Sequence, residues 1–281
     1  MRVVALDSQM LNAMQLCPEL FNLRFVQNYR LVAKAPALER GDHMHRLLKY
    51  YYNQKKAGRT DINNVIREAV DVAGKASVAM DVPQAEIHEH EFQFRAYVLY
   101  YAQDSWIPLE VEQPFSKVLY ERPDEPKREG IRIVYEGIID LIADTPHGIR
   151  VVDHKTTSRR KVPSGRSNQF IGYSWALGVN NVIVNKIGFQ KTLTEKERFN
   201  RHLLNYSSPI IQEWVKETAG WVKTMVQYID AQYFPHNNTS CDKYSGCDFR
   251  MVCETQADVR EFKRLSFYKK VEPWSPHARD Y

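Results

Sequence analysis

Apolar residues in the first part of the chain recur at spacings of three and four positions. This periodicity is typical of amphipathic helices that bury one face. It predicts helices over residues 8–29, 37–54, 61–76 and 88–104, with Ser8 as the N-cap of the first. The chain is therefore expected to begin with a helical region.

After residue 105 the pattern changes to alternation of apolar and polar residues, rich in β-formers. It predicts strands over residues 108–120, 130–144, 149–158 and 185–193. The turn-like residues 145–148 would join the second and third strands as a hairpin. Two more helices are predicted over residues 168–178, with Gly178 as C-cap, and 199–232, broken near Pro209. Helices flanking a central mixed sheet define an α/β fold class.

The composition fits a globular protein that stays inside the cell. The 281 residues are 43% hydrophobic and 26% charged, and no run approaches 18 apolar residues, so no membrane span is expected. The first ten residues lack the apolar core of a signal peptide. A cytoplasmic location is therefore expected.

The net charge of +5 permits nucleic-acid binding without requiring it. The charge is uneven, because residues 158–166 hold four basic residues and no acid. Such a segment can be an ordinary solvated loop. It can also grip phosphates, since it directly follows a predicted strand that carries candidate chemistry.

That chemistry lies on the predicted hairpin. Residues two apart on a strand share a face, so Asp153 and Lys155 point the same way and His154 the other. Asp140, on the first strand of the hairpin, can lie near Asp153. Both acids sit in apolar runs, where an unpaired carboxylate is costly. A single Asp–Lys pair is the simplest explanation, but two acids and one Lys fit a divalent-cation site better.

A cation at this place would polarise a phosphodiester and lower the pKa of a bound water. Lys155 would orient that water and stabilise developing negative charge. The main-chain carbonyl of His154 could supply a further oxygen ligand. The spacing of the two acids and the lysine is a weak signal when taken alone.

The rest of the sequence strengthens this signal, because several segments resemble the RecB-like branch of the PD-(D/E)xK nuclease superfamily. The segments are residues 41–45, EGIID at 136–140, VVDHKTT at 151–157 and QFIGY at 169–173, in the family's order. The resemblance implies metal-ligand roles for His45, Asp140 and Asp153, and a catalytic role for Lys155. It also implies a restriction-endonuclease-like core and Mg²⁺ or Mn²⁺ as the metal.

Gln169 and Tyr173 match the family's Q-x-x-x-Y motif and share one helix face. Both can donate hydrogen bonds to a phosphate or steady the lysine, although alone they would be taken for an ordinary surface pair. His43 competes with His45 from a different helix face. Glu112, on the preceding strand, is a candidate accessory acid, although a surface acid is the simpler explanation.

The four cysteines are Cys17, Cys241, Cys247 and Cys253. One cysteine before the nuclease core and three after it resemble the AddB-like and CRISPR-associated RecB-like exonucleases, which carry a 4Fe–4S cluster. The family's distal group is more often C-x2-C-x5-C, whereas the first spacing here is five. Four thiolates can also hold zinc, and unligated cysteines are the third alternative.

The sequence thus predicts one nuclease domain over residues 1–281, comprising a helical region (1–105), a catalytic core (106–200) and a C-terminal cap with the cysteines (201–281). The expected activity is metal-dependent cleavage of DNA, by an exonuclease acting on free ends or single strands. A catalytically weak DNA-binding subunit and a zinc-stabilised RNA-cleaving enzyme are the alternatives. No G-x-x-x-x-G-K-[ST] motif is present, so the protein is expected to act alone or beside a separate helicase or recombination protein.

Overall fold

The computed structural model describes residues 1–32, 36–79, 82–126, 129–157, 165–189, 192–243 and 246–273, and of residues 36–41 the backbone alone. Its internal contacts divide the chain into two compact units. Unit 1 comprises Met1–Lys34, Ser116–Gly137 and Pro209–Tyr281, and unit 2 comprises Ala35–Phe115 and Ile138–Ser208. No helix among the described residues is long and apolar enough to cross a membrane.

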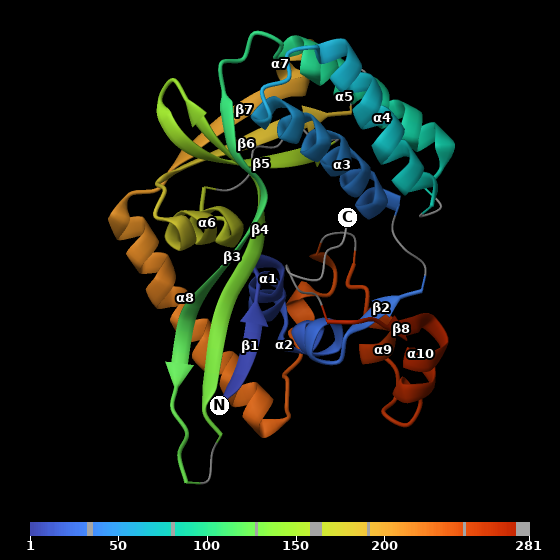
Figure 1. The fold of residues 1–281 in the computed structure, drawn as a ribbon. Helices are drawn as coiled ribbons and strands as arrows, with labels where there is room; N and C mark the ends of the chain where they lie inside the picture. The colour runs from blue at the N-terminus through green and yellow to red at the C-terminus, as the bar shows by residue number, and fades with distance from the viewer. Residues whose placement is uncertain are drawn as a thin grey trace. The chain divides into compact units, whose positions relative to one another are not determined.

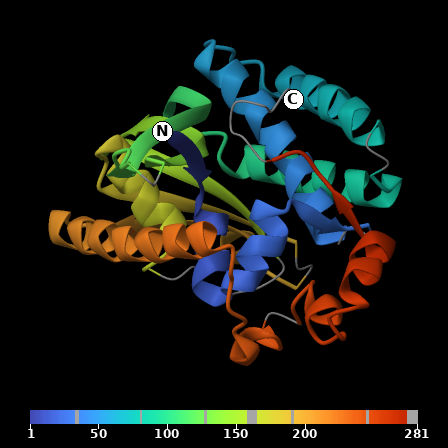
Figure 2. The same ribbon diagram turned by 90° about the horizontal axis from the view of Figure 1, so that it is seen from below.

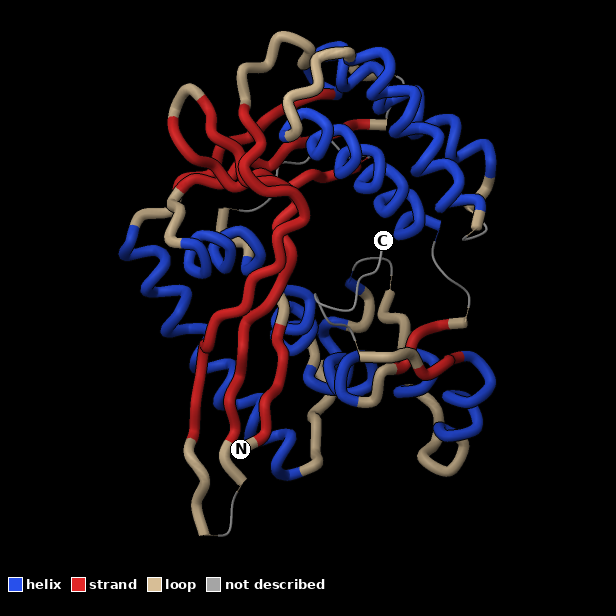
Figure 3. The backbone as a smooth tube through the Cα atoms, viewed as in Figure 1, coloured by secondary structure: helices blue, strands red, loops and turns tan. Residues whose placement is uncertain are grey.

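A mixed sheet is the centre of the fold. Within the described residues it has six strands in the order β1-β4-β5-β6-β7, and β3 also pairs with β4. The β1–β4 and β5–β6 pairs are parallel, and β4–β5 and β6–β7 are antiparallel. Figure 3 shows the long strands β3 and β4 side by side. The predicted α/β class with a mixed central sheet flanked by helices is confirmed.

Unit 2 contains three long helices packed on one face of the sheet. Its elements, with the two strands it shares with unit 1, are α3 (Pro36–Lys56), α4 (Ile62–Val78), α5 (Gln84–Tyr100), β3 (Ile107–Arg122), β4 (Ile131–Thr145), β5 (Gly148–Thr157), α6 (Asn168–Leu177), β6 (Asn181–Gly188), α7 (Glu195–Arg198) and β7 (Phe199–Asn205). Figure 1 shows α3, α4 and α5 beside one another. Their buried residues form one core with Leu141, Val152 and Ile183 of the sheet, which fixes α3 over the middle strands.

Unit 1 contains the ends of the chain. Its own elements are β1 (Arg2–Leu6), α1 (Ser8–Leu16), α2 (Pro18–Phe21), the π-helix η1 (Asn22–Val26), β2 (Tyr29–Leu31), α8 (Ser208–Ala231), η2 (Asn238–Ser240), α9 (Arg250–Cys253), α10 (Arg260–Phe267) and β8 (Tyr268–Lys270). The short strands β2 and β8 pair antiparallel, although they come from opposite ends of the sequence. Figure 2 shows β8 next to α10.

Most predicted elements are present, but the predicted helix over residues 8–29 is interrupted at Cys17 and ends at Val26. Cys17 is extended, with φ −162°, and Pro18 then begins a separate helix, because proline favours an extended residue before it. The N-cap is Asp7, whose carboxylate accepts from the Met10 backbone N–H at 2.7 Å, and not Ser8. Strand β1 was not predicted, since five residues give too little pattern.

The predicted helix over residues 199–232 is wrong in its first part, which is strand β7, while α8 begins at Ser208 with Pro209 in its first turn. The strand is hidden in the sequence because a cation fills one of its inward positions. The Arg201 guanidinium lies 3.6 Å from the ring centre of Tyr101 and 3.5 Å from that of Trp106, and it binds Asp104 at 2.7 Å. Apolar alternation is lost there.

The buried pair of Arg201 and Asp104 should contribute to the free energy of unfolding. The side chains of Arg201 and Asp104 are 15% and 9% exposed, so removing one leaves an uncompensated charge. We expect Arg201→Met to lower the free energy of unfolding by about 3 kcal/mol, measured by urea denaturation. Lys56→Met, which removes an exposed pair with Glu110, should change it little. Equal effects of the two substitutions would contradict this account.

Candidate active site

The hairpin of β4 and β5 opens where the two acids lie. The ladder of paired residues ends at Leu141 and Val152, so the next position would set Asp140 opposite Asp153. There the His154 backbone N–H donates to the Asp140 carboxylate, Oδ2, at 2.7 Å. A side chain of β4 therefore takes the place of a backbone acceptor. This exchange holds Asp140 against the start of the D-x-K segment.

Asp153 and Lys155 share one face of β5, as the strand alternation predicts. The Lys155 ammonium lies 2.9 Å from Oδ2 of Asp153 and 3.2 Å from its Oδ1. The Asp153 side chain is 2% exposed and the Lys155 side chain 41%. The buried carboxylate therefore positions a cation that reaches solvent.

Helix α6 supports the Asp153 carboxylate from the same side. Gln169 donates to Oδ1 of Asp153 at 2.9 Å, and its Nε2 also lies 2.8 Å from the Tyr173 hydroxyl. Tyr173 in turn donates to the Ile138 carbonyl at 3.1 Å. Both motif residues thus orient Asp153 and anchor it to β4. The expected contact from Gln169 to the lysine is replaced by a contact to the lysine's partner.

His45 of α3 is the histidine that reaches the acids. Its Nδ1 lies 3.5 Å from Oδ1 of Asp140. His43 is fully buried, lies 2.6 Å from the Ser77 hydroxyl, and stacks on His90. The structure therefore separates the two candidates: His45 lies at the hairpin and His43 among the helices.

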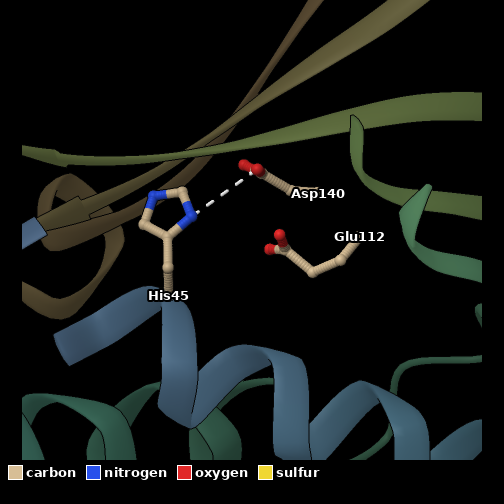
Figure 4. Close-up of side chains that lie close together, drawn as sticks. All are labelled: His45, Glu112 and Asp140. Carbon is tan, nitrogen blue, oxygen red and sulfur yellow. Dashed lines mark ion pairs between the residues drawn. The ribbon is translucent and has the colours of Figure 1, made fainter. Parts of the chain in front are cut away.

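Glu112 of β3 joins His45 and Asp140. One ligand atom from each of the three lies within 4.8 Å of the others, and the structure places this group alone, among the described residues, close enough for one metal ion. Figure 4 shows the Glu112 carboxylate turned toward the other two side chains. Asp153 is outside the group, being engaged by Lys155 and Gln169.

The backbone of Glu112 has an unusual conformation. Its φ is +53°, in the left-handed region that costs about 1–2 kcal/mol for a residue with a side chain. Inside a strand this conformation is typical of a bulge, which redirects a side chain. The sequence indicates only a surface or accessory acid at Glu112, because alternation does not show that the strand is redirected there.

The charges of the group favour a cation. Burial would raise the pKa of Asp140, but the opposite charge and hydrogen bond of His45, with His154 and Lys155, hold it well below its usual range. Burial would lower the pKa of His45, but the charge of Asp140 and its hydrogen bond raise it to about 9. Asp140 is therefore an ionised ligand, and His45 holds a proton that a metal ion would displace.

The pKa values of the neighbouring residues Asp153, His154 and Lys155 shift for different reasons. Burial raises the pKa of Asp153, helped by the nearby charge of Asp140 and opposed by Lys155. Burial would lower the pKa of Lys155, but Asp153 and Asp140 raise it. Burial lowers the pKa of His154 to about 3, so its imidazole is neutral. The lysine is thus a permanent cation beside an acid-rich site.

The four cysteines all belong to unit 1 and line one cavity of about 630 Å³. Cys17 is 9% exposed and accepts from the Asn237 backbone N–H at 3.4 Å. Burial raises the pKa of the Cys253 thiol to about 12, aided by Glu19 and the other three thiols. No three cysteine sulfurs in the described part of the chain lie within 4.8 Å of one another.

The chain belongs to the PD-(D/E)XK nuclease superfamily, whose model matches residues 8–254. The fold resembles the crystal structure of a proposed exonuclease from Eubacterium rectale, at 11% identity and a TM-score of 0.48, over 84% of this chain and 85% of that one. It also resembles the crystal structure of SSO0001, at 15% identity and a TM-score of 0.33, over 78% and 94%. No curated protein sequence matches.

Replacing Glu112, whose backbone is strained, should weaken metal binding and stabilise the metal-free protein. Glu112→Gly should weaken Mn²⁺ binding about tenfold or more, because one carboxylate is lost. It should also raise the denaturation midpoint of the metal-free protein, because glycine relieves the positive φ. Glu110→Gly, two residues earlier, is the control and should lower the midpoint. A loss of stability in Glu112→Gly would argue that the residue is structural.

Proposed function

We propose that this chain is a metal-dependent deoxyribonuclease that cuts DNA from its ends. Membership of the nuclease superfamily supports a nucleic-acid substrate. The observation that carries the proposal is the group of His45, Glu112 and Asp140 beside the Asp153–Lys155 pair. Together they supply a place for a cation and a place for a phosphate.

The donor set fits a divalent cation. Glu112, Asp140 and Asp153 lie at the site, where Lys155 pairs with Asp153 and the protonated His45 pairs with Asp140. Two carboxylates and one imidazole suit Mn²⁺ well and Mg²⁺ with added water. We propose His45, Glu112 and Asp140 as the ligands. Asp153 is a further ligand that the family resemblance implies, and the main-chain carbonyl of His154 could supply another oxygen.

A bound cation would supply a Lewis acid for the phosphodiester and a water of lowered pKa. Lys155 holds its ammonium on Asp153 and offers positive charge where a phosphate oxygen becomes more negative. Gln169 and Tyr173 fix the rotamer of Asp153, so the ammonium is held in place before substrate arrives. The residues of this chain would therefore bind the cation, orient the Lys155 ammonium and stabilise negative charge on the phosphate.

The experiment that tests this function is digestion of one DNA in three forms. Labelled linear duplex, labelled single strand and closed circle are incubated with Mn²⁺, Mg²⁺ or EDTA, beside an RNA of the same sequence. We expect metal-dependent loss of the linear DNAs from their ends and survival of the circle. Cleavage of the circle would replace exonuclease by endonuclease action, cleavage of RNA alone would establish the RNA-cleaving alternative, and no cleavage would overturn the proposal.

Phosphate contacts beyond the site are expected from the basic segment, whose Arg159, Arg160 and Lys161 lie outside the described residues. With no nucleotide-binding loop motif in the sequence, we propose that the enzyme works alone or beside a separate helicase or recombination protein.

We further propose that the four cysteines hold a 4Fe–4S cluster in the cavity of unit 1. Tetrahedral zinc with Zn–S bonds of about 2.3 Å would require sulfurs about 3.8 Å apart. The cysteines surround a shared cavity without such a close group. The proposal of a cluster rests on the four cysteines lining this one cavity, and zinc and unligated cysteines are the alternatives.

A further inference from the structure

A chain of polar side chains runs through the core behind the candidate metal site. Its members are Tyr52 of α3, Tyr97 of α5, Asn185 of β6 and His154 of β5, and all are at most 3% exposed. They lie in or against the apolar core that α3, α4 and α5 form with the sheet. Buried polar groups of this kind stabilise a fold less than apolar residues do unless each finds its partners.

The chain is closely hydrogen-bonded. The two tyrosine hydroxyls lie 2.7 Å apart. The Asn185 amide nitrogen lies 2.9 Å from the Tyr97 hydroxyl and 2.8 Å from Nδ1 of His154. Asn185 and His154 are register partners on adjacent parallel strands, so the sheet itself sets them side by side.

These contacts hold the imidazole of His154 in place. The Asn185 amide nitrogen donates to the Tyr97 hydroxyl, and the same amide shares a hydrogen bond with Nδ1 of His154. Its ring stacks on the ring of Tyr52, with 5.4 Å between centres and 10° between planes.

The other end of the chain meets the metal site twice. The edge of the His154 ring faces His45, with 6.3 Å between centres and 72° between planes. The backbone N–H of the same residue donates to the Asp140 carboxylate at 2.7 Å. Two proposed ligands are thus in contact with one residue whose own position is fixed by the buried chain.

We propose that Tyr52, Tyr97, Asn185 and His154 form a positioning network that presets His45 and Asp140 for a divalent cation. The inference rests on the proposed metal site, and it assigns a role to residues outside the family's motif positions. The alternative is that the network only stabilises the fold. In that case its disruption would lower stability and leave metal binding unchanged.

The test measures Mn²⁺ affinity of the full-length protein by calorimetry, without DNA. Asn185→Leu and the double variant Tyr52→Phe/Tyr97→Phe should weaken binding about tenfold or more, the range seen when groups behind metal ligands are removed. Ser77→Ala is the matched control: it removes a buried hydrogen bond to His43 in the same helical layer and should bind Mn²⁺ like wild type.

Nitrogen NMR of the histidine side chains supplies a second readout. Asn185→Leu should shift the Nδ1 signal of His154 relative to wild type, because the hydrogen-bond partner of Nδ1 is lost. Unchanged affinity in both folded variants, or an unchanged Nδ1 signal in Asn185→Leu, would overturn the network. If Asn185→Leu does not fold, the Mn²⁺ affinity of Tyr52→Phe/Tyr97→Phe, which removes only hydroxyl groups, tests the network. Wild type that binds no Mn²⁺ would overturn the proposed metal site and the network with it.

Discussion

Asp153→Asn or Lys155→Ala should reduce metal-dependent DNA cleavage at least about a thousandfold, while the protein stays folded. The first change removes the charge that holds the ammonium in place, and the second removes the ammonium. Asp140→Asn should behave similarly, because it removes ligand charge with little change in volume. Initial rates on end-labelled DNA and circular dichroism would measure both parts of the expectation.

Lys75→Ala is the matched control for charge loss. This lysine forms an exposed pair with Asp71 on α4, so its removal should leave the rate within a factor of two or so. A cleavage rate near wild type in purified Asp153→Asn or Lys155→Ala would exclude the hairpin as the active site.

Cys17→Ser should abolish the 4Fe–4S cluster that we propose for the cysteines of unit 1. If the cysteines hold a 4Fe–4S cluster, protein purified without oxygen is brown and contains about four iron atoms per chain. The variant should be colourless, retain almost no iron and melt at a lower temperature, because the binding free energy of a structural metal group is also folding free energy. Metal analysis and a thermal melt on the same sample would show the two losses together.

The control lies in the same cavity. Ser240→Ala removes a buried hydroxyl that donates to the Asn237 carbonyl at 2.8 Å. The substitution perturbs the wall of the cavity without removing a thiol, so this variant should keep its iron. One zinc atom per chain in wild type would replace the cluster by the zinc alternative. Absence of both metals would leave the cysteines as ordinary core residues. Mg²⁺-dependent cleavage should persist in Cys17→Ser at low temperature, since the candidate active site lies in unit 2.

Strand alternation predicted the positions of the hairpin side chains, because it is a local property. The shared face of Asp153 and Lys155 follows from a spacing of two residues, and Asp140 follows from the hairpin register. The helical spacing of Gln169 and Tyr173 likewise placed them together. The roles of these residues stay proposals, but their positions follow from periodicity.

The remaining features depend on contacts that no local pattern encodes. Glu112 enters the site through a left-handed residue within a strand. The preference for His45 over His43 is decided by the packing of α3 against the hairpin and the other helices. Arg201 occupies an inward position because Tyr101 and Trp106 accept its guanidinium. Each depends on partners far away in the sequence.

A crystal of the protein soaked with Mn²⁺ would locate the cation by the anomalous scattering of manganese. We expect a peak bound by Asp140 together with His45 or Glu112, and the loss of this peak in a crystal of Asp140→Asn. A manganese peak elsewhere with none at these residues, or an unchanged peak in Asp140→Asn, would contradict this expectation.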